Sequence, residues 1–221
     1  GSNLVKNLNL YLSKNSIIFN KCLLIIDKNV PSKIVSKITN SLKRKKVSKF
    51  IFTANEKNKN INYVNKILQI LLDKNFSRQD CIITIGGGIT GDVGGFAASL
   101  YKRGLGYINV PTTLLSQVDS SIGGKTGVNT KEGKNLIGSF YQPKIVISDT
   151  DFLKTLSKRE IICGYGEVFK HSLILNKNFY KFLDKNSLQI LNLKSPYIQK
   201  AIFESCKIKM KIVEKDEKEK N

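Results

Sequence analysis

The chain has 221 residues, of which 41% are hydrophobic and 9% aromatic, a composition typical of a folded protein with a sizeable core. Its net charge of +20 comes almost entirely from dispersed lysines rather than arginines, so we expect no nucleic-acid partner. The apolar runs are strand-sized and no cleavable leader opens the chain, so we expect no membrane segment and a cytoplasmic location.

Over the first 150 residues, short β-branched runs alternate with helical patterns. Strands are expected at residues 22–27, 49–54, 81–85, 107–110 and 145–148, and helices at 31–46, 61–74 and 93–101. The run Cys81–Ile85 is almost continuously apolar, as a strand buried on both faces should be. Strands separated by helices pair in parallel, so residues 1–150 predict a layered α/β domain.

The pattern changes after Asp149. Residues 158–175, 179–183 and 195–214 all follow helical periodicity, and no further strand is expected there. We therefore predict a domain boundary near residue 150 and an α-helical domain that begins at residue 151. That second domain is short, and residues 215–221 form a charged run without an apolar anchor.

A glycine-rich segment follows the third predicted strand. Gly86, Gly88 and Gly91 satisfy the G-x-G-x-x-G pattern and lead into a helix, whose N-terminus suits a pyrophosphate. The standard fingerprint follows the first strand and has an acidic residue about 20 positions later, whereas here the next acidic residue after Asp92 is Asp119. The segment predicts a dinucleotide site of a non-standard kind, and a plain tight turn is the alternative.

A second polar loop follows the strand at residues 107–110. Residues 124–126 resemble the end of a phosphate-binding P-loop, but Asp119 stands where that motif requires glycine. The loop still offers Lys125, Lys134 and Asn135, which would suit an anionic, polyhydroxylated substrate. A flexible surface loop is the alternative.

In the helical region, Glu167, Lys170 and His171 fall on one helical face. A carboxylate and an imidazole there could ligate a metal, and an exposed salt-bridged face is the alternative. His171 is the only histidine in the chain, so these residues cannot build a closed, histidine-rich site.

Taken together, these strings resemble the 3-dehydroquinate synthase family. The matching stretches are Gly86–Tyr101, Arg103–Gly104, Pro111–Gly138, Phe140–Pro143, Asp149–Leu156, Gly166–His171 and Lys209–Glu217. The block at residues 111–143 is the most specific of them. The resemblance implies an N-terminal Rossmann-like domain that binds NAD, followed by an α-helical domain that holds a divalent metal, zinc or cobalt.

The resemblance also implies roles for individual residues. NAD would be held by Asp27, Glu56, Lys59, Gly88, Ile89, Thr90, Gly91, Asp92, Thr112, Thr113, Lys125, Lys134, Phe152, Leu153, Lys154 and Thr155. The catalytic and substrate-binding set would be Arg103, Asp119, Lys125, Lys134, Asn135, Lys170 and Lys209. Glu167 would be the first metal ligand, and the protein would be a homodimer.

The implied activity is that of a lyase of the shikimate pathway. It would convert 3-deoxy-D-arabino-heptulosonate 7-phosphate into 3-dehydroquinate and phosphate by transient oxidation with NAD, β-elimination, re-reduction and aldol closure. A related sugar-phosphate cyclase, a non-catalytic NAD-binding module and, third, a nucleic-acid-binding module remain open as alternatives.

The chain departs from the family pattern at two places. Asn55 stands where the family has glycine in its G-E-x-x-K string, which would alter the contacts of Glu56. The family continues past the last matching segment to two further histidine ligands, whereas this chain stops at Asn221. We therefore expect a truncated chain that is inactive by itself, with Glu167 as its only family metal ligand.

Overall fold

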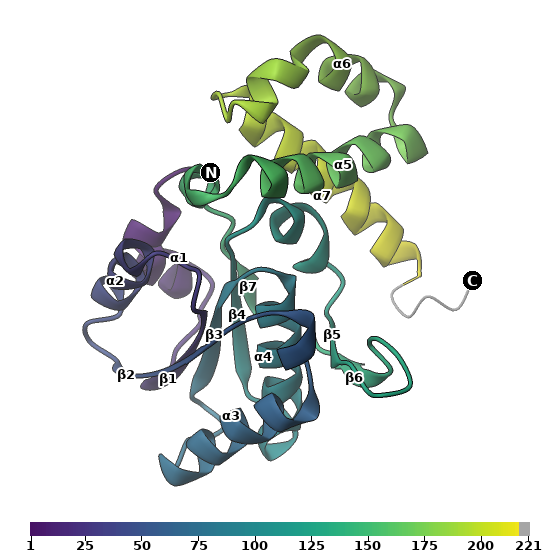
Figure 1. The fold of residues 1–221 in the computed structure, drawn as a ribbon. Helices are drawn as coiled ribbons and strands as arrows, with labels where there is room; N and C mark the ends of the chain where they lie inside the picture. The colour runs from purple at the N-terminus through teal and green to yellow at the C-terminus, as the bar shows by residue number, and fades with distance from the viewer. Residues whose placement is uncertain (217–221) are drawn as a thin grey trace.

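A computed structural model describes residues 1–216, so the predicted charged run at 215–221 lies almost wholly outside the described residues. Its main feature is a sheet of five parallel strands in the order β2-β1-β3-β4-β7 (Figure 1). The strands are β1 (Lys21–Asp27), β2 (Lys46–Phe52), β3 (Cys81–Gly86), β4 (Gly106–Pro111) and β7 (Ile145–Val146). The predicted α/β class with a parallel sheet is confirmed.

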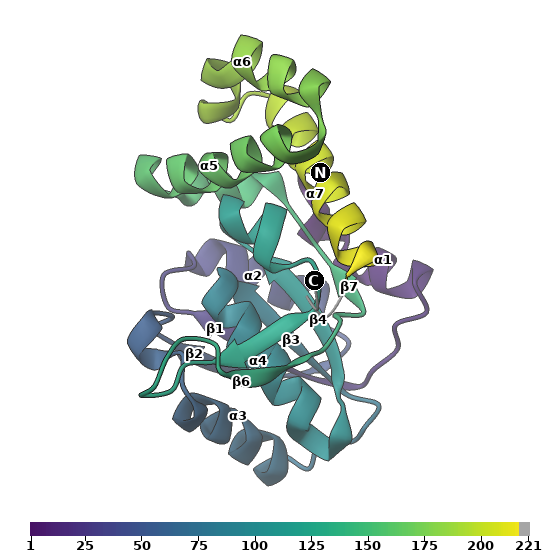
Figure 2. The same ribbon diagram turned by 90° about the vertical axis from the view of Figure 1, so that its right-hand side faces the viewer.

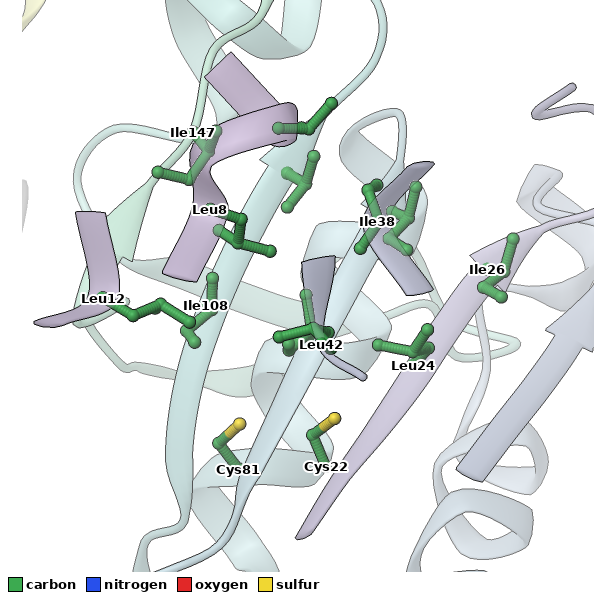
Figure 3. Packing of buried hydrophobic residues seen from close by; sticks show 14 of the residues in the cluster. Leu8, Leu12, Cys22, Leu24, Ile26, Ile38, Leu42, Cys81, Ile108 and Ile147 are labelled. Carbon is green, nitrogen blue, oxygen red and sulfur yellow. The ribbon is translucent and has the colours of Figure 1, made fainter. Parts of the chain in front are cut away.

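Two helices cover each face of this sheet (Figure 1). Helices α1 (Leu8–Lys14) and α2 (Ser32–Ser41) pack on one face, and α3 (Ile61–Asp73) and α4 (Gly88–Leu100) on the other. Successive strand residues point to opposite faces, so Leu24 and Ile26 meet α2 while Leu23 and Ile25 meet α3 and α4. Figure 3 shows the first of these two cores, with Leu8, Ile38 and Leu42 packed over the strands.

A short hairpin projects beside α4, where the sequence predicted only a glycine-rich loop. Strands β5 (Lys125–Val128) and β6 (Ile137–Phe140) pair antiparallel after a π-helical turn, η4 (Ser116–Ser120). Periodicity missed the hairpin because its strands are short and rich in glycine. Those glycines allow the close pairing, since a Cβ at Gly138 would lie 2.1 Å from the Thr126 carbonyl oxygen.

Three helices gather at the other end of the molecule (Figure 2). They are α5 (Lys158–Leu175), α6 (Lys177–Leu191) and α7 (Tyr197–Lys215). Ser157 and Glu160 form a reciprocal capping box that fixes where α5 begins. The core of this region also takes in Leu114, Val118 and Leu153 from the segments after the sheet strands, so the helices rest directly on the sheet's connecting loops.

Short 3₁₀ turns complete the fold: η1 (Leu4–Asn7), η2 (Glu56–Asn58), η3 (Tyr101–Arg103) and η5 (Thr150–Thr155). The η1 turn is held from far along the chain, because the Asp149 carboxylate accepts hydrogen bonds from the backbone N–H groups of Asn3 at 3.0 Å and Val5 at 3.2 Å. Within the described residues, none of the helices combines the length and apolar character that crossing a bilayer requires.

Several predicted boundaries were wrong. Helix α2 ends at Ser41 rather than residue 46, because Lys46 already pairs with Lys21 in the sheet. Helix α4 begins at Gly88 rather than residue 93, so the second half of the glycine-rich segment is the first helical turn. Helix α6 runs over 15 residues where only 179–183 was expected, and α1 was not predicted at all.

Candidate functional site

The site begins where the sheet changes direction. The chain passes from β1 outward to β2 and then returns to β3 on the other side, so the carboxyl ends of β1 and β3 form the crevice at which such sheets bind ligands. Asp27 ends β1 and Gly86 ends β3. The two are close, since a Cβ at Gly86 would lie 3.1 Å from the Asp27 Cβ.

A glycine cradle lies at this crevice, in front of the N-terminus of α4. A Cβ at Gly86 would lie 2.4 Å from Thr90 Oγ1, and a Cβ at Gly88 would lie 2.9 Å from Ser120 Oγ. Side chains at these glycines would fill the space in front of the helix. The cradle therefore lets an anionic group approach the helix N-terminus and its positive dipole end, which fits the pyrophosphate of a dinucleotide.

Thr112 and Thr113 follow β4 and border the same cradle. Thr112 N–H donates to the Gly86 carbonyl at 2.9 Å, and Thr113 Oγ1 donates to Ser116 Oγ at 2.8 Å. Tyr107 on β4 donates its hydroxyl to the Gly91 carbonyl at 3.1 Å. Ile89 is partly buried against the α3–α4 core. The predicted cofactor residues from Gly88 to Thr113 therefore share one neighbourhood.

Lys59 joins three parts of the site. Its ammonium lies 2.5 Å from Asp92 Oδ2 on α4 and donates to Asn135 Oδ1 at 2.5 Å, before the β6 strand. Burial raises the pKa of Asp92, and the nearby Lys59 charge offsets part of that rise. The family resemblance implies NAD binding for Lys59 and Asp92 and substrate binding for Asn135, and Lys59 contacts both of the others.

Glu56 faces the loop between β5 and β6. Asn129 Nδ2 donates to Glu56 Oε2 at 2.9 Å, and the exposed Lys134 ammonium lies 3.5 Å from the same oxygen. The hydrogen bond from Asn129, with help from Lys134, lowers the pKa of Glu56. Asn55 has extended backbone and its side chain accepts from Asn58 N–H, so the η2 turn forms without the family's glycine.

The segment at η5 contributes mainly apolar contacts. Phe152 and Leu153 are buried in the cores on either side, and Thr155 Oγ1 donates to the Phe152 carbonyl at 2.7 Å. Lys154 is exposed and pairs with Asp151 at 2.6 Å. Nothing in this geometry directs the Lys154 ammonium toward the cradle.

A cleft of about 580 Å³ opens between the hairpin, η4 and α7. Five of the predicted site residues line it: Asp92, Asp119, Lys125, Asn135 and Lys209. The Lys209 ammonium crosses from α7 to Asp119 Oδ1 at 2.8 Å. The resemblance alone had singled out Lys209 among the lysines of α7, and its long-range contact with Asp119 is what places it in the cleft.

Arg103 is not part of this cleft. It follows the C-terminal end of α4, and a helix of 13 residues spans roughly 20 Å from the glycine cradle. Its backbone φ is +64°, so the chain turns sharply there toward β4. The structure of the single chain thus separates Arg103 from the other predicted catalytic residues.

Next to the cleft lies a candidate metal centre. Asp119 on η4 and Glu167 and His171 on α5 each offer one ligand atom, and these atoms lie within 4.8 Å of one another. His171 is 1% exposed, its Nε2 is 3.2 Å from Glu167 Oε1, and Lys170 pairs with the same oxygen. Burial lowers the pKa of His171, while the Glu167 charge acts in the opposite direction.

This donor set fits a divalent ion. A neutral imidazole and two carboxylates suit zinc or cobalt, and the buried Glu167 Oε1 is contacted by the Lys170 ammonium and by His171 Nε2. Glu167 was expected to be the only family ligand in the chain, and no sequence pattern indicated that Asp119 lies beside it. Ser205, which contacts His171, was missed as well, although a serine among the apolar core positions of α7 was a usable signal.

The switch-point crevice with its glycine cradle and the adjoining carboxylate–imidazole cluster define a class: an α/β fold of the dinucleotide-binding type with a candidate metal centre on its helical side. Comparison with known proteins identifies one family. The chain belongs to the 3-dehydroquinate synthase family, whose N-terminal model matches residues 49–163 and whose C-terminal model matches residues 164–221.

Named relatives agree with this placement. A 3-dehydroquinate synthase of Pelagibacter ubique is 64% identical over 219 residues, covering 99% of this chain and 60% of the relative. One of Alkaliphilus metalliredigens is 46% identical over 199 residues, covering 90% and 56%. The chain thus spans about 60% of the length of the curated relatives that it matches.

Solved structures share the fold. A 2-deoxy-scyllo-inosose synthase complexed with carbaglucose-6-phosphate, NAD+ and Co2+ matches with a TM-score of 0.90 and 30% identity, over 100% of this chain and 60% of that one. A 2-epi-5-epi-valiolone synthase from Streptomyces hygroscopicus with NAD+ and Zn2+ bound has a TM-score of 0.91 at 24% identity, over 100% and 62%. The second likeness concerns the fold alone.

Proposed function

We propose that this protein acts as a 3-dehydroquinate synthase, converting 3-deoxy-D-arabino-heptulosonate 7-phosphate into 3-dehydroquinate and phosphate. The observation that carries the proposal is the cleft in which Asp119, Lys125 and Lys209 meet beside the glycine cradle and the metal cluster. It is supported by the 64% identity to a 3-dehydroquinate synthase.

NAD and a divalent metal are the cofactors we propose, as in the 2-deoxy-scyllo-inosose synthase complex. When bound, NAD supplies a reversible hydride acceptor and the metal a Lewis acid. The chain would hold the pyrophosphate at Gly86–Gly91 and the metal at Glu167. The domain division at residue 150 stays a prediction; the two family models meet between residues 163 and 164.

The cleft residues then bind and orient the substrate. The ammonium groups of Lys125 and Lys209 would offset the negative charges of the phosphate and carboxylate groups. Asp119 and Asn135 would accept or donate hydrogen bonds to the substrate hydroxyls, which fixes the ring relative to the cofactor. Lys59 holds Asn135 and Asp92 in place, so its role would be to position them.

A related sugar-phosphate cyclase is the second candidate. The structural likeness to an inosose synthase at 30% identity favours it more than any other alternative. A non-catalytic NAD-binding module comes next. The homodimer stays a prediction from the family resemblance, and the cytoplasmic location stays a prediction from the sequence composition.

The test is phosphate release from 3-deoxy-D-arabino-heptulosonate 7-phosphate by the complete gene product, with NAD and zinc. We expect release that stops on chelation or when NAD is omitted. Lys209→Met should lower kcat/KM about 100-fold, since a charge-assisted contact is worth about 2–3 kcal/mol.

Lys207→Met is the matched control, because Lys207 is an exposed lysine on the same helix and does not line the cleft. It should leave kcat/KM nearly unchanged. If the complete gene product released phosphate from another sugar phosphate but not from this one, the related cyclase would replace the proposal. If no sugar phosphate released phosphate, the non-catalytic NAD-binding module would be the remaining candidate function.

A further inference from the structure

An asparagine just after β5 connects proposed cofactor residues with a proposed substrate residue. Asn129 is half-buried and belongs to neither set. Together with Glu56 and Lys59, from the cofactor set, it lines a second cleft of about 840 Å³. Asn135, from the substrate set, lines the cleft of about 580 Å³ described above. The loop between β5 and β6 therefore borders both clefts.

The side chain of Asn129 makes hydrogen bonds at both of its ends. Its Nδ2 donates to Glu56 Oε2 at 2.9 Å and to the Glu56 carbonyl at 3.3 Å, and its Oδ1 accepts from Asn135 N–H at 3.1 Å. Its backbone N–H donates to the Lys59 carbonyl at 2.8 Å. These partners fix the orientation of the amide, since a flipped amide would set its oxygen against the two oxygens of Glu56.

Asn135 depends on such support because its backbone conformation is uncommon. Its φ is +58°, in the left-handed region that residues other than glycine seldom occupy. Asn129 holds the backbone N–H of Asn135, and the Lys59 ammonium holds its side chain through Oδ1 at 2.5 Å. The Asn135 amide nitrogen is then the group that can donate to a substrate hydroxyl. Both contacts together set the direction in which it does so.

Two other sets of contacts in the loop contribute less to its attachment. Thr130 N–H donates to the Gly133 carbonyl at 2.9 Å, and Thr130 Oγ1 accepts from Glu132 N–H at 3.2 Å, so these bonds lie within the loop. Lys134 does reach the η2 turn, but its ammonium is 3.5 Å from Glu56 Oε2 and both side chains are more than half exposed. Such a pair contributes little, because solvent screens it.

We propose that Asn129 is a positioning residue, which ties the β5–β6 loop to the η2 turn and so holds Asn135 in the conformation that binds substrate. The inference rests on the proposed function, because Asn135 is a substrate residue only within it. Asn129 would act through its neighbours: through Asn135 on the substrate side and through Glu56 on the cofactor side.

A double-mutant cycle in the complete gene product, with NAD and zinc, tests whether Asn129 acts through Asn135. Asn129→Ala should lower kcat/KM for 3-deoxy-D-arabino-heptulosonate 7-phosphate about 10-fold, because the hydrogen bonds that position Asn135 are lost. In a protein that already carries Asn135→Ala, the same change should lower kcat/KM by less than about 2-fold, since the two residues act as one unit.

Thr130→Ala is the matched control. It changes the neighbouring loop residue and removes side-chain contacts to Glu132 and Gly133, which lie inside the loop. The tie from Asn129 to the η2 turn is kept. We expect kcat/KM to stay within about 2-fold of the unchanged protein, as for most surface substitutions.

A second measurement does not need turnover. The folded 221-residue chain is digested with trypsin, and the cleavage sites are followed by mass spectrometry. Cleavage after Lys131 and Lys134, both exposed in the loop, should be about 5-fold faster in Asn129→Ala, because the loop is released from the η2 turn. Cleavage after Arg44, in the exposed turn between α2 and β2, serves as the reference within each digest.

The outcomes separate this proposal from the proposed function. An unchanged kcat/KM in Asn129→Ala, or an equal loss with and without Asn135→Ala, would overturn the positioning role. Unchanged trypsin cleavage in the loop would overturn it as well. If the complete gene product released no phosphate from this substrate while Asn129→Ala still accelerated cleavage in the loop, the tie to the η2 turn would stand and the proposed function alone would fail.

Discussion

Asp80 connects the start of β1 with the loop that leads into β3. Its carboxylate is almost fully buried and accepts hydrogen bonds from Lys21 N–H at 2.9 Å, Ser77 N–H at 2.7 Å and Ser77 Oγ at 2.9 Å. Burial alone would raise the pKa of Asp80. The hydrogen bonds to Ser77 and Lys21 outweigh that effect and hold the pKa below its ordinary value of 3.8.

We expect Asp80→Ala to lower the free energy of unfolding by about 2–3 kcal/mol near neutral pH, because hydrogen bonds to a charged acceptor are lost. Because the pKa of Asp80 is lower in the folded state, its stabilising effect is fully present above the pKa of the unfolded state. That stabilisation is lost as the pH falls through the pKa of the folded state. Urea unfolding measures the free energy of unfolding of the unchanged protein and of Asp80→Ala. The difference between these two values should therefore become smaller as the pH falls below the pKa of the unfolded state. A difference in the free energy of unfolding that does not change with pH would contradict the role given to the charged Asp80 carboxylate.

At the scale of residues, sequence analysis placed Glu167 and His171 on one face because both belong to one helix. It could not place Asp119 or Ser205 beside them, since the contact of Ser205 with His171 spans 34 residues. Periodicity describes neighbours within an element. The contacts that complete the site come from packing between elements, which a single sequence does not encode in any local pattern.

At the scale of elements, α5 approaches the end of β4 through one glycine. A Cβ at Gly164 would lie 2.5 Å from Leu114 Cβ and 2.7 Å from the Leu115 backbone nitrogen. A Cβ at Gly166, two residues later on the same helix, would have no neighbouring atom within 4 Å, so this glycine faces open space. Substituting alanine at each of the two glycines therefore distinguishes the effect of close packing from the effect of helix propensity.

Gly164→Ala should reduce the free energy of unfolding by about 1–3 kcal/mol, because the helix must move away from Leu114. Gly166→Ala should leave it unchanged or raise it by up to about 1 kcal/mol, since alanine favours the helix. Chemical denaturation of both variants measures this directly. Equal effects at the two positions would show that packing against Leu114 is not what requires a glycine.

The elements that sequence analysis predicted well are those with strong periodicity. Helices α3 and α5 and strand β3 were placed within a residue or two, since each has a clear apolar pattern. The β5–β6 hairpin was missed because Gly127 and Gly138 carry no pattern. Helix α4 was started too late because its first turn is built from Gly88 and Gly91, which also form the cradle.

At the scale of the whole molecule, the net charge of +20 should oppose the compact state through self-repulsion. Raising NaCl from about 20 mM to about 200 mM screens that repulsion, since the Debye length then falls below 10 Å. We expect Tm to rise by roughly 2–4 °C, equivalent to about 1 kcal/mol. Differential scanning calorimetry of the apo chain measures it.

A charge variant serves as the control. Lys43 and Arg44 are exposed just after α2, and Lys43→Glu with Arg44→Glu lowers the net charge without changing a buried contact. Its Tm should respond less to salt than that of the parent chain. An equal response in both proteins, or a Tm that falls with salt, would mean that repulsion does not limit stability.

The strand order could not be read from the sequence. Alternating strands and helices predicted parallel pairing, but the order β2-β1-β3-β4-β7 depends on which strands meet, and that is decided by packing over long distances. The order matters for the site, because the pairing of β1 with β3 brings Asp27 next to Gly86. The fold class was thus predictable, whereas the location of the crevice was not.

The hydrogen bonds from Asn3 and Val5 to the Asp149 carboxylate have a consequence for folding during synthesis. Synthesis runs from the N-terminus, so Asn3 leaves the ribosome before its partner Asp149, which follows 146 residues later. Until Asp149 has left the exit tunnel, the η1 turn has neither of these two hydrogen bonds. During synthesis this turn therefore completes its contacts much later than its own residues are made.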